Sequence, residues 1–528
     1  MGNITPYQKM VNQFLVENLV KKYYCLLSFL APLIVRAIPE IVSFPWPLGY
    51  DTVTWYAPVV NFCQIYGPLY SLAVFTDWRM APLLYIVMGF TGCIPGVDPI
   101  MVTKSFGPLL SGCLGFSVFF FSRSCLGWDV RKSLACALLC TSYFVTLRLT
   151  WDSYRNVLGF IFFILALSAA SNLNKRWGAF SLLVFSFLCA FSHELVTIVL
   201  LLTLIYLVLL EVHRKLGGYD FRMRNLVVLF VSLLPPAVLL AYYYTNWMGN
   251  TISYFYNPFA YSSGGILVDY ISLRVSLYLY PTVDVLNAHI IHLFTVCFAP
   301  ILPLVVLGYF RNDALDVTTL FLLVGSFMPL VLPHSALPLW SRWMFMLTVP
   351  FAMYATNFLF PDDTRAILAK KLRIPRFIRT RSLVVVVPLL VLLSSTYMVL
   401  PGNIAFPYFS NVNTARYLPS TMQYNTVPVS MSQDVVLALS WMEFNMSLDS
   451  CIIAHESLAG WASLAFPFKQ VFLYSFMDVG FQSALMRAKG FGKIYVLTLF
   501  PYDFVVKESG FKLVFRAGLV EVFINETA

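Results

Sequence analysis

The sequence predicts an α-helical polytopic membrane protein with about 11 transmembrane helices and a small C-terminal extramembrane α/β domain. Hydrophobic residues make up 59% of the 528 residues, charged residues only 11%, and the mean hydropathy is +0.76. This composition excludes a water-soluble globular protein. Apolar runs of roughly 15–22 residues, separated by short polar breaks, are typical of helices that cross a bilayer.

The first 400 residues hold the candidate transmembrane helices and are expected to form one membrane domain. Eleven apolar segments are candidates for crossing the bilayer: 24–42, 105–122, 133–149, 157–171, 178–192, 195–211, 225–244, 286–309, 317–332, 343–359 and 383–400. A further apolar stretch, 81–94, is interrupted by Gly89, Gly92 and Pro95 and is followed by Asp98. Length and hydropathy alone leave its status open.

The distribution of lysine and arginine decides how segment 81–94 is placed. If it does not cross the membrane, the main basic segments all fall on one side: 1–23, 123–132, 172–177, 212–224 and 360–382. Cytoplasmic loops carry such an excess of basic residues. We therefore expect a cytoplasmic N-terminus, a first external loop at 43–104 and a long external loop at 245–285. The expected location is the cell membrane, with the endoplasmic reticulum membrane as the alternative.

The last part of the chain, 401–528, has a different pattern. Its charge density rises, and its apolar runs shorten to the length of strands at 451–454, 471–474, 494–497 and 519–524. Helical patterns near 432–444 and 480–489 alternate with these runs. The alternation predicts a small α/β domain, and the positive-inside pattern places it on the external face.

Charge and cysteine usage exclude two other classes of site. The formal net charge is +10, but the basic residues lie in short loops between apolar runs, which indicates membrane orientation and not nucleic-acid binding. The ten cysteines show no CxxC spacing and lie mostly inside apolar segments. They predict no zinc or iron–sulfur site.

Two carboxylates are the strongest candidates for chemistry. Asp51 follows the first apolar segment, after a Pro/Gly turn and among aromatic residues, and Asp152 lies in the loop 150–156 between two later helices. A carboxylate near hydrocarbon is costly, so an acid placed there indicates function. On one face they could supply a general base or bind a divalent cation, Mg or Mn. The alternative for Asp152 is that it caps the next helix and pairs with Arg155.

Arg342 is predicted to lie on the external face, where the positive-inside rule expects few basic residues. Its guanidinium group presents a fork of donors that matches a phosphate, which predicts recognition of a phosphate-bearing lipid headgroup. The alternative is an interfacial arginine in an aromatic belt with Trp340 and Trp343.

Two further pairs of ionisable residues have simpler interpretations. His193 and Glu194 lie where two apolar segments meet; they could bind a metal or transfer protons, but more often such residues break and hydrate a helical hairpin. Arg36 and Glu40 are one helical turn apart in the first helix and predict an internal ion pair.

The external acid after the first helix, the later acidic loop, the external arginine and the extramembrane C-terminal domain together resemble the GT-C superfamily of membrane glycosyltransferases. The order looks most like the archaeal-type oligosaccharyltransferase catalytic subunit and related polyprenyl-phosphate-sugar transferases. The resemblance implies that Asp51 matches the first-loop acid, that Asp152-Ser153-Tyr154 matches a D-x-D-like motif, and that Arg342 contacts the donor phosphate, with Arg155 as a second candidate.

The chain also departs from that family's pattern. Tyr154 replaces the second acid of the D-x-D motif, Asp284 gives only a short match to an acidic loop motif, and the run 454–462 lacks a WWDYG-type acceptor motif. These departures favour transfer to an acceptor other than a protein sequon.

The resemblance implies a glycosyltransferase that moves a sugar from a polyprenyl- or dolichyl-phosphate donor to a glycan, lipid or protein acceptor on the external face. Asp51 would act as the base, and Asp152, with or without a metal, would support it. One alternative is a transporter or lipid flippase, for which charged residues deep in the membrane and broken helices in related halves are expected. The other is a non-catalytic subunit of a membrane glycosylation complex.

Overall fold

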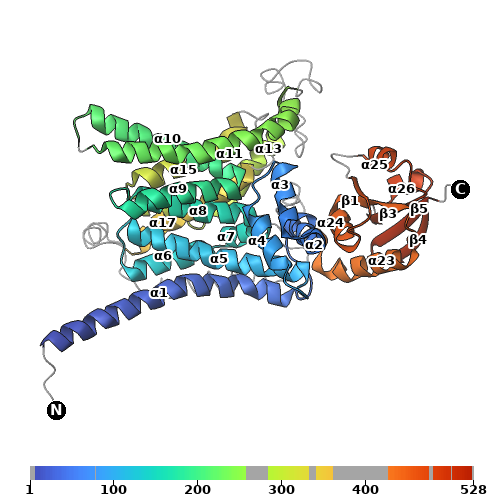
Figure 1. Cartoon of the computed structure of the whole chain (residues 1–528), viewed down its shortest axis with the longest axis horizontal. Helices are drawn as coiled ribbons and strands as arrows, with labels where there is room; N and C mark the ends of the chain where they lie inside the picture. Colours follow the sequence, from blue (N-terminus) through green and yellow to red (C-terminus); the bar gives the residue numbers. More distant parts are fainter. Residues whose placement is uncertain are drawn as a thin grey trace, which may run out of the picture.

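The computed structural model describes residues 6–77, 79–219, 221–256, 283–331, 340–360, 426–474, 480–500 and 502–525. The predicted span 383–400 and the basic segment 360–382 lie outside these residues, apart from Phe360. Helices run side by side in a bundle, and the start of α1 (Pro6–Val42) and the C-terminal domain lie at opposite ends of it (Figure 1). This arrangement agrees with a cytoplasmic N-terminus and an external C-terminal domain, while the sidedness itself stays a prediction.

Five helices in the described part of the chain are long and apolar enough to cross a membrane. They are Lys22–Val42 of α1, α5 (Pro99–Ser124), α10 (Glu194–Leu216), Met223–Tyr243 of α11 (Met223–Tyr256) and α15 (Asp313–Val331). Two bent helix pairs raise the number to seven if each is one span: α6 (Val130–Ser142) with α7 (Phe144–Asp152), and α13 (Val283–Phe298) with α14 (Leu302–Gly308).

The predicted count of about 11 spans is not confirmed, and the reason is helix length. Helices α8 (Tyr154–Ala170) and α9 (Arg176–Ser192) have 17 residues each, which is about 26 Å against a hydrocarbon core of about 30 Å. The predicted span 343–359 is divided into α16 (Trp340–Met346) and α17 (Thr348–Leu359). The loop predicted from residue 245 begins later, because α11 continues to Tyr256.

The segment predicted as the first external loop, 43–104, contains the short elements η1 (Thr52–Tyr56), α2 (Ala57–Tyr66), η2 (Pro68–Leu72), α3 (Ala73–Thr76) and α4 (Leu83–Gly92). The ten residues of α4 make it about 15 Å long, half of a hydrocarbon core. A helix of this length fits the prediction that 81–94 does not cross. In Figure 1 these elements lie between the helix bundle and the C-terminal domain.

The C-terminal domain contains a five-stranded sheet in the order β2-β1-β3-β5-β4. Its strands are β1 (Ser450–His455), β2 (Val471–Tyr474), β3 (Lys493–Leu499), β4 (Lys512–Ala517) and β5 (Val520–Asn525). The first three are parallel, and β5 pairs antiparallel with both β3 and β4. The four predicted strands and both predicted helices are present; β4 was missed because Lys512 and Arg516 limit its apolar run to three residues.

Helices cover both faces of this sheet and create two separate hydrophobic cores. Helices α23 (Ser432–Asn445) and α24 (Glu456–Ala465) pack on one face, where Leu439, Leu458 and Ile452 are buried together. Helices α25 (Phe481–Arg487) and α26 (Phe504–Glu508) cover the other face, which buries Ile453 and Val496. Alternate residues of β1 thus point into different cores, as the pleat of a strand requires.

A labelling experiment tests the predicted sidedness. We expect single cysteines at Asp98→Cys and Ser440→Cys to react with a membrane-impermeant maleimide added outside intact cells, because both positions belong to the predicted external face. The native cysteines in the described part are buried or half-buried, which keeps the background low. Reaction at position 98 only after cytoplasmic access would show that 81–94 crosses and that the assigned external face is wrong.

Candidate functional site

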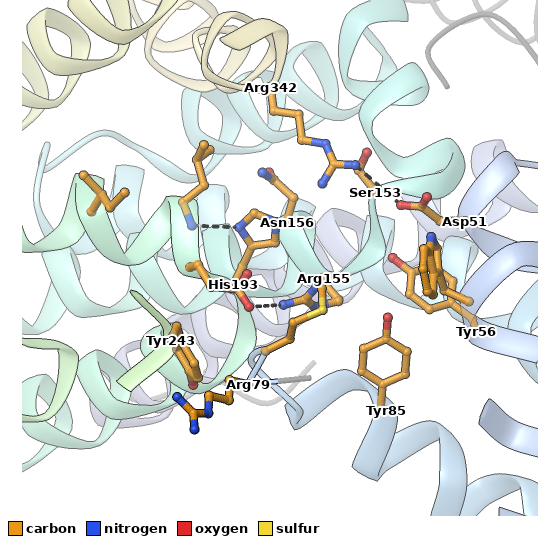
Figure 2. Close-up of a pocket in the computed structure, with 15 residues that line it drawn as sticks. Asp51, Tyr56, Arg79, Tyr85, Ser153, Arg155, Asn156, His193, Tyr243 and Arg342 are labelled. Atoms are coloured by element: carbon orange, nitrogen blue, oxygen red, sulfur yellow. Dashed lines mark hydrogen bonds and ion pairs between the residues drawn. The ribbon is translucent and has the colours of Figure 1, made fainter. Parts of the chain in front are cut away.

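A pocket of about 240 Å³ lies at the end of the helix bundle that faces the first external loop (Figure 2). Five of the predicted site residues line it together: Asp51, Arg155, His193, Glu194 and Arg342. They come from segments that are up to 291 positions apart in the sequence, since the first is residue 51 and the last is residue 342. Sequence reasoning assigned them to one face, and the fold brings them to one cavity.

Asp51 is presented by a turn that enters η1. Gly49 has a φ of 88°, a conformation that glycine adopts readily, so the predicted glycine turn is present. The carboxylate Oδ2 of Asp51 lies 3.6 Å from Nη2 of Arg342, whose side chain is 18% exposed against 15% for Asp51. The predicted acid and the predicted phosphate-binding arginine are therefore neighbours, and each partly neutralises the other (Figure 2).

Arg155 is engaged by a second carboxylate. Its Nη2 atom lies 2.5 Å from Oε1 of Glu194, and the same oxygen accepts a hydrogen bond from the Ala81 amide at 2.7 Å. The ion pair links α8 to the start of α10, and the Ala81 bond ties both to the external loop. The N-cap residue of α8 is Ser153, and the alternative in which Asp152 caps this helix and pairs with Arg155 depends on a side chain outside the described residues. Arg155 has its ion pair with Glu194.

His193 has a structural role in the cap of α10. Its Nδ1 atom accepts a hydrogen bond from the Leu195 amide at 3.2 Å, which satisfies one of the free donors of the first turn. Burial lowers the pKa of the His193 imidazole well below its usual range, and the nearby Arg155 and Arg342 lower it further. The ring is therefore neutral, and Nε2 carries its proton. The structural interpretation that the sequence favoured for this residue agrees with these contacts.

Tyr154 contributes an aromatic surface where the related motif has an acid. Its ring stacks on Tyr56 with centroids 5.3 Å apart and planes 10° apart, and Tyr56 in turn lies against Tyr85. Tyr154 is fully buried and lies behind the pocket wall. Asp152 is the last residue of α7 and Asp284 lies in the first turn of α13. The side chains of these two acids are outside the described residues.

Sequence reasoning missed Arg79, which also lines the pocket. Arg79 has a φ of 49°, an uncommon conformation for a residue other than glycine that often marks functional sites. Its guanidinium group lies 5.8 Å from the ring centroid of Tyr242, which is a cation–π contact. Like Arg342, it belongs to the predicted external face and is next to a tryptophan, Trp78, and that signal could have found it. Tyr85, Asn156 and Tyr243 were missed as well.

A buried charge cluster supports the end of α7. The predicted ion pair is confirmed: Nη2 of Arg36 lies 2.8 Å from Oε1 of Glu40, and Nζ of Lys104 lies 3.0 Å from Oε2 of the same residue. Arg36 also donates hydrogen bonds to the carbonyls of Thr150 and Trp151. These carbonyls directly precede Asp152, so the cluster fixes the main chain that carries the second predicted acid.

The electrostatics of the described pocket residues favour an anion. Three arginines, at 79, 155 and 342, face two carboxylates, Asp51 and Glu194, while His193 is neutral. Among the described residues, no group of three or more His, Cys, Asp or Glu side chains could hold a metal ion. Asp51 faces a guanidinium group, which is a poor environment for a second cation.

No protein-family model and no curated protein matches this sequence. Solved structures do match the fold. Over 97% of this chain and 98% of the other, the structure resembles ArnT from Cupriavidus metallidurans bound to undecaprenyl phosphate, with a TM-score of 0.50 and 11% sequence identity. For the same protein in the apo state the TM-score is 0.51, with 11% identity and 98% of both chains covered.

The fold of this chain is that of ArnT. At the level of the fold, this likeness supports the resemblance predicted from the external acid, the external arginine and the C-terminal domain. Together with the apolar helices, this likeness makes the chain an integral membrane protein. Because the match extends over nearly the whole of both chains, the C-terminal domain is part of the shared architecture.

Proposed function

We propose that this protein is a glycosyltransferase that moves a sugar from a polyprenyl- or dolichyl-phosphate donor to an acceptor at the external face of the membrane. The observation that carries the proposal is the pairing of Asp51 with Arg342 in a pocket with an excess of arginines. A base next to an anion-binding group is what transfer from a phosphate leaving group requires. The undecaprenyl phosphate in the ArnT structure, which shares this fold, supports a donor of the same chemical class.

In this proposal the donor phosphate binds to the guanidinium groups of Arg342 and Arg79. Arg155 contributes less to phosphate binding, because its guanidinium group already forms an ion pair with Glu194. Among the described residues that line the pocket, three arginines outnumber two carboxylates, which favours the binding of a phosphate diester. Leu195 and Ile198 give the pocket an apolar wall, and exclusion of water strengthens each of these charge interactions.

Asp51 acts as the general base in this scheme. Its carboxylate takes the proton of an acceptor hydroxyl, the hydroxyl oxygen forms a bond to the anomeric carbon, and the bond from that carbon to the phosphate oxygen breaks. The electron pair leaves with the polyprenyl phosphate, whose new negative charge lies next to Arg342. A single displacement of this kind inverts the anomeric configuration.

Metal dependence stays a prediction. Asp51 and Asp152 are the proposed ligands for Mg or Mn, and the side chain of Asp152 is not among the described residues. The described surroundings of Asp51 do not fit a cation, so no step of the scheme uses one. Transfer that is lost in EDTA and restored by either ion would confirm the metal.

The proposal is tested with the purified full-length chain in lipid nanodiscs and a panel of polyprenyl-phosphate sugars. We expect release of free polyprenyl phosphate from at least one donor when extracts containing glycans, lipids and proteins are added as acceptors. Asp51→Asn should reduce this release by roughly 10²–10⁴-fold. In sealed liposomes, movement of the donor between leaflets without any sugar transfer would instead identify a flippase.

Replacing Arg342 tests the phosphate site. Arg342→Lys keeps the positive charge but loses the planar fork of donors, so we expect donor KM to rise with a smaller effect on thermal stability. Arg342→Ala should weaken donor binding further. The matched control is Arg214→Lys, since Arg214 lies in an exposed pair with Glu211 on the basic side of α10. Unchanged donor affinity in Arg342→Ala would remove this residue from the site.

A further inference from the structure

The turn after Asp51 is packed between two hydrophobic cores. Tyr56, at the end of η1, belongs to the core of the helix bundle. Val53, three residues earlier, is 1% exposed and belongs to the core of the C-terminal domain, together with Leu458 and Trp461 of α24. One turn of π-helix therefore joins both cores, and Asp51 directly precedes it. Short π-helical segments are often found at functional sites.

Gly460 allows α24 to approach this turn. A Cβ atom at position 460 would lie 2.5 Å from the carbonyl oxygen of Val53 and 2.7 Å from Cα of Thr54. Both are main-chain atoms, which cannot rotate away as the end of a flexible side chain can. Helix α24 thus rests directly on the backbone of η1, and a larger residue at position 460 must push the two apart.

A second contact fixes the other end of α24. The Nδ2 atom of Asn61, on α2, donates a hydrogen bond to the carbonyl of Leu464 in the last turn of α24, with a distance of 3.0 Å. This carbonyl is one of those that a helix end leaves without a partner inside the helix. Figure 1 shows α24 next to α2 at the junction between the bundle and the C-terminal domain. Gly460 and Asn61 therefore define one docking contact between α24 and the external loop.

We propose that the C-terminal domain is a positioning component of the active site: α24, seated on η1 through Gly460, fixes the main chain that presents Asp51 to Arg342. The part of this inference that concerns catalysis by Asp51 rests on the proposed function. Arg342 is carried by α16 of the bundle, so the distance between its guanidinium group and Asp51 depends on how the loop is held. A displacement of about 1 Å at a reacting group can reduce a rate by about 10²-fold.

The test compares Gly460→Val with Val496→Ala in the full chain. Val496 is buried in the other core of the same domain, on the far face of the sheet, so its truncation destabilises the domain without touching η1. For Gly460→Val we expect kcat to fall by about 10–100-fold, with donor KM within about twofold because the arginines stay in place. Hydrogen–deuterium exchange should rise in the peptide 50–58. Val496→Ala should lower the Tm while leaving kcat and the exchange of that peptide near wild type.

Asn61→Ala keeps the test decisive if Gly460→Val does not fold. It removes one hydrogen bond and introduces no clash, so it should give a smaller loss of kcat and a smaller rise in exchange of the peptide 50–58. Equal losses of kcat in Gly460→Val and Val496→Ala at equal loss of Tm would overturn the proposal, because the domain would then matter only for folding. Unchanged exchange and kcat in both contact variants would overturn it as well. If no donor is turned over by the wild type, increased exchange still supports the docking role, and only the proposed function fails.

Discussion

Asp51→Asn is expected to give a folded protein whose sugar transfer is reduced by roughly 10²–10⁴-fold, which is about 3–5 kcal/mol of activation free energy. The amide cannot accept the proton of the acceptor hydroxyl, and it no longer attracts Arg342, which lies 3.6 Å away. We expect a smaller effect on stability than on rate, because the two charged atoms are 3.6 Å apart and both side chains keep some contact with solvent. The measurement is kcat for polyprenyl phosphate release, at matched expression and with Tm determined in parallel.

His193→Ala is the control for this experiment, because His193 lines the same pocket as Asp51. Its side chain caps α10, and loss of a cap typically costs about 1 kcal/mol. The imidazole is neutral and buried, with Nδ1 used by the Leu195 amide, so it is not the base of the scheme. We expect His193→Ala to retain much of the wild-type activity. Activity in Asp51→Asn, or its loss in both variants, would contradict the assignment of the base.

Glu40→Gln is expected to destabilise the helix bundle by about 3–5 kcal/mol, because it leaves two buried cations, Arg36 and Lys104, without their shared carboxylate. The side chains of all three residues are buried at the contact between α1 and α5. The desolvation of the cations is then no longer offset by a counter-charge. Thermal unfolding in detergent, followed by circular dichroism, measures the loss as a lower Tm.

Glu211→Gln provides the matched control. Glu211 also forms an ion pair within one helix, with Arg214 at 2.8 Å, but that pair is near the surface. We expect a change within about 1 kcal/mol for Glu211→Gln. A triple variant with Met at positions 36 and 104 and Gln at 40 should recover part of the stability that Glu40→Gln loses, because apolar groups replace the uncompensated cations. A Tm for Glu40→Gln equal to that of Glu211→Gln would show that the cluster contributes no net stability.

The same cluster connects stability to the pocket. Arg36 donates to the carbonyls of Thr150 and Trp151, and the next residues form the junction of α7 and α8 that supplies Ser153 and Arg155 to the pocket. The ion pair of Arg155 with Glu194 then reaches the external loop through the Ala81 amide. Polar contacts of this kind, buried among apolar helices, hold functional groups in register where the hydrophobic effect between helices in lipid is weak.

Local sequence signals determined much of the architecture. Apolar length predicted the long helices α5, α10 and α15, because a bilayer demands about 20 consecutive apolar residues. Short apolar runs, which alternate with helical patterns, predicted four of the five strands of the C-terminal domain. Asp51 and Arg342 could be singled out because a charged group at a membrane surface is costly, and this rule needs no partner to be known. The fold shared with ArnT follows the same layout.

Only the tertiary structure decided which groups meet. Arg155 pairs with Glu194, which lies 39 positions later in the sequence, and the stacking of Tyr154 on Tyr56 joins residues 98 positions apart. Bends between α6 and α7, and between α13 and α14, divide two apolar segments that their hydropathy predicts to be single membrane spans. Val53 belongs to the core of a domain that begins hundreds of residues later. A local sequence pattern reflects the free energy of moving that segment out of water, so it predicts where the segment lies. Which distant segments contact each other depends on how whole helices and domains pack, and a local pattern does not give this information.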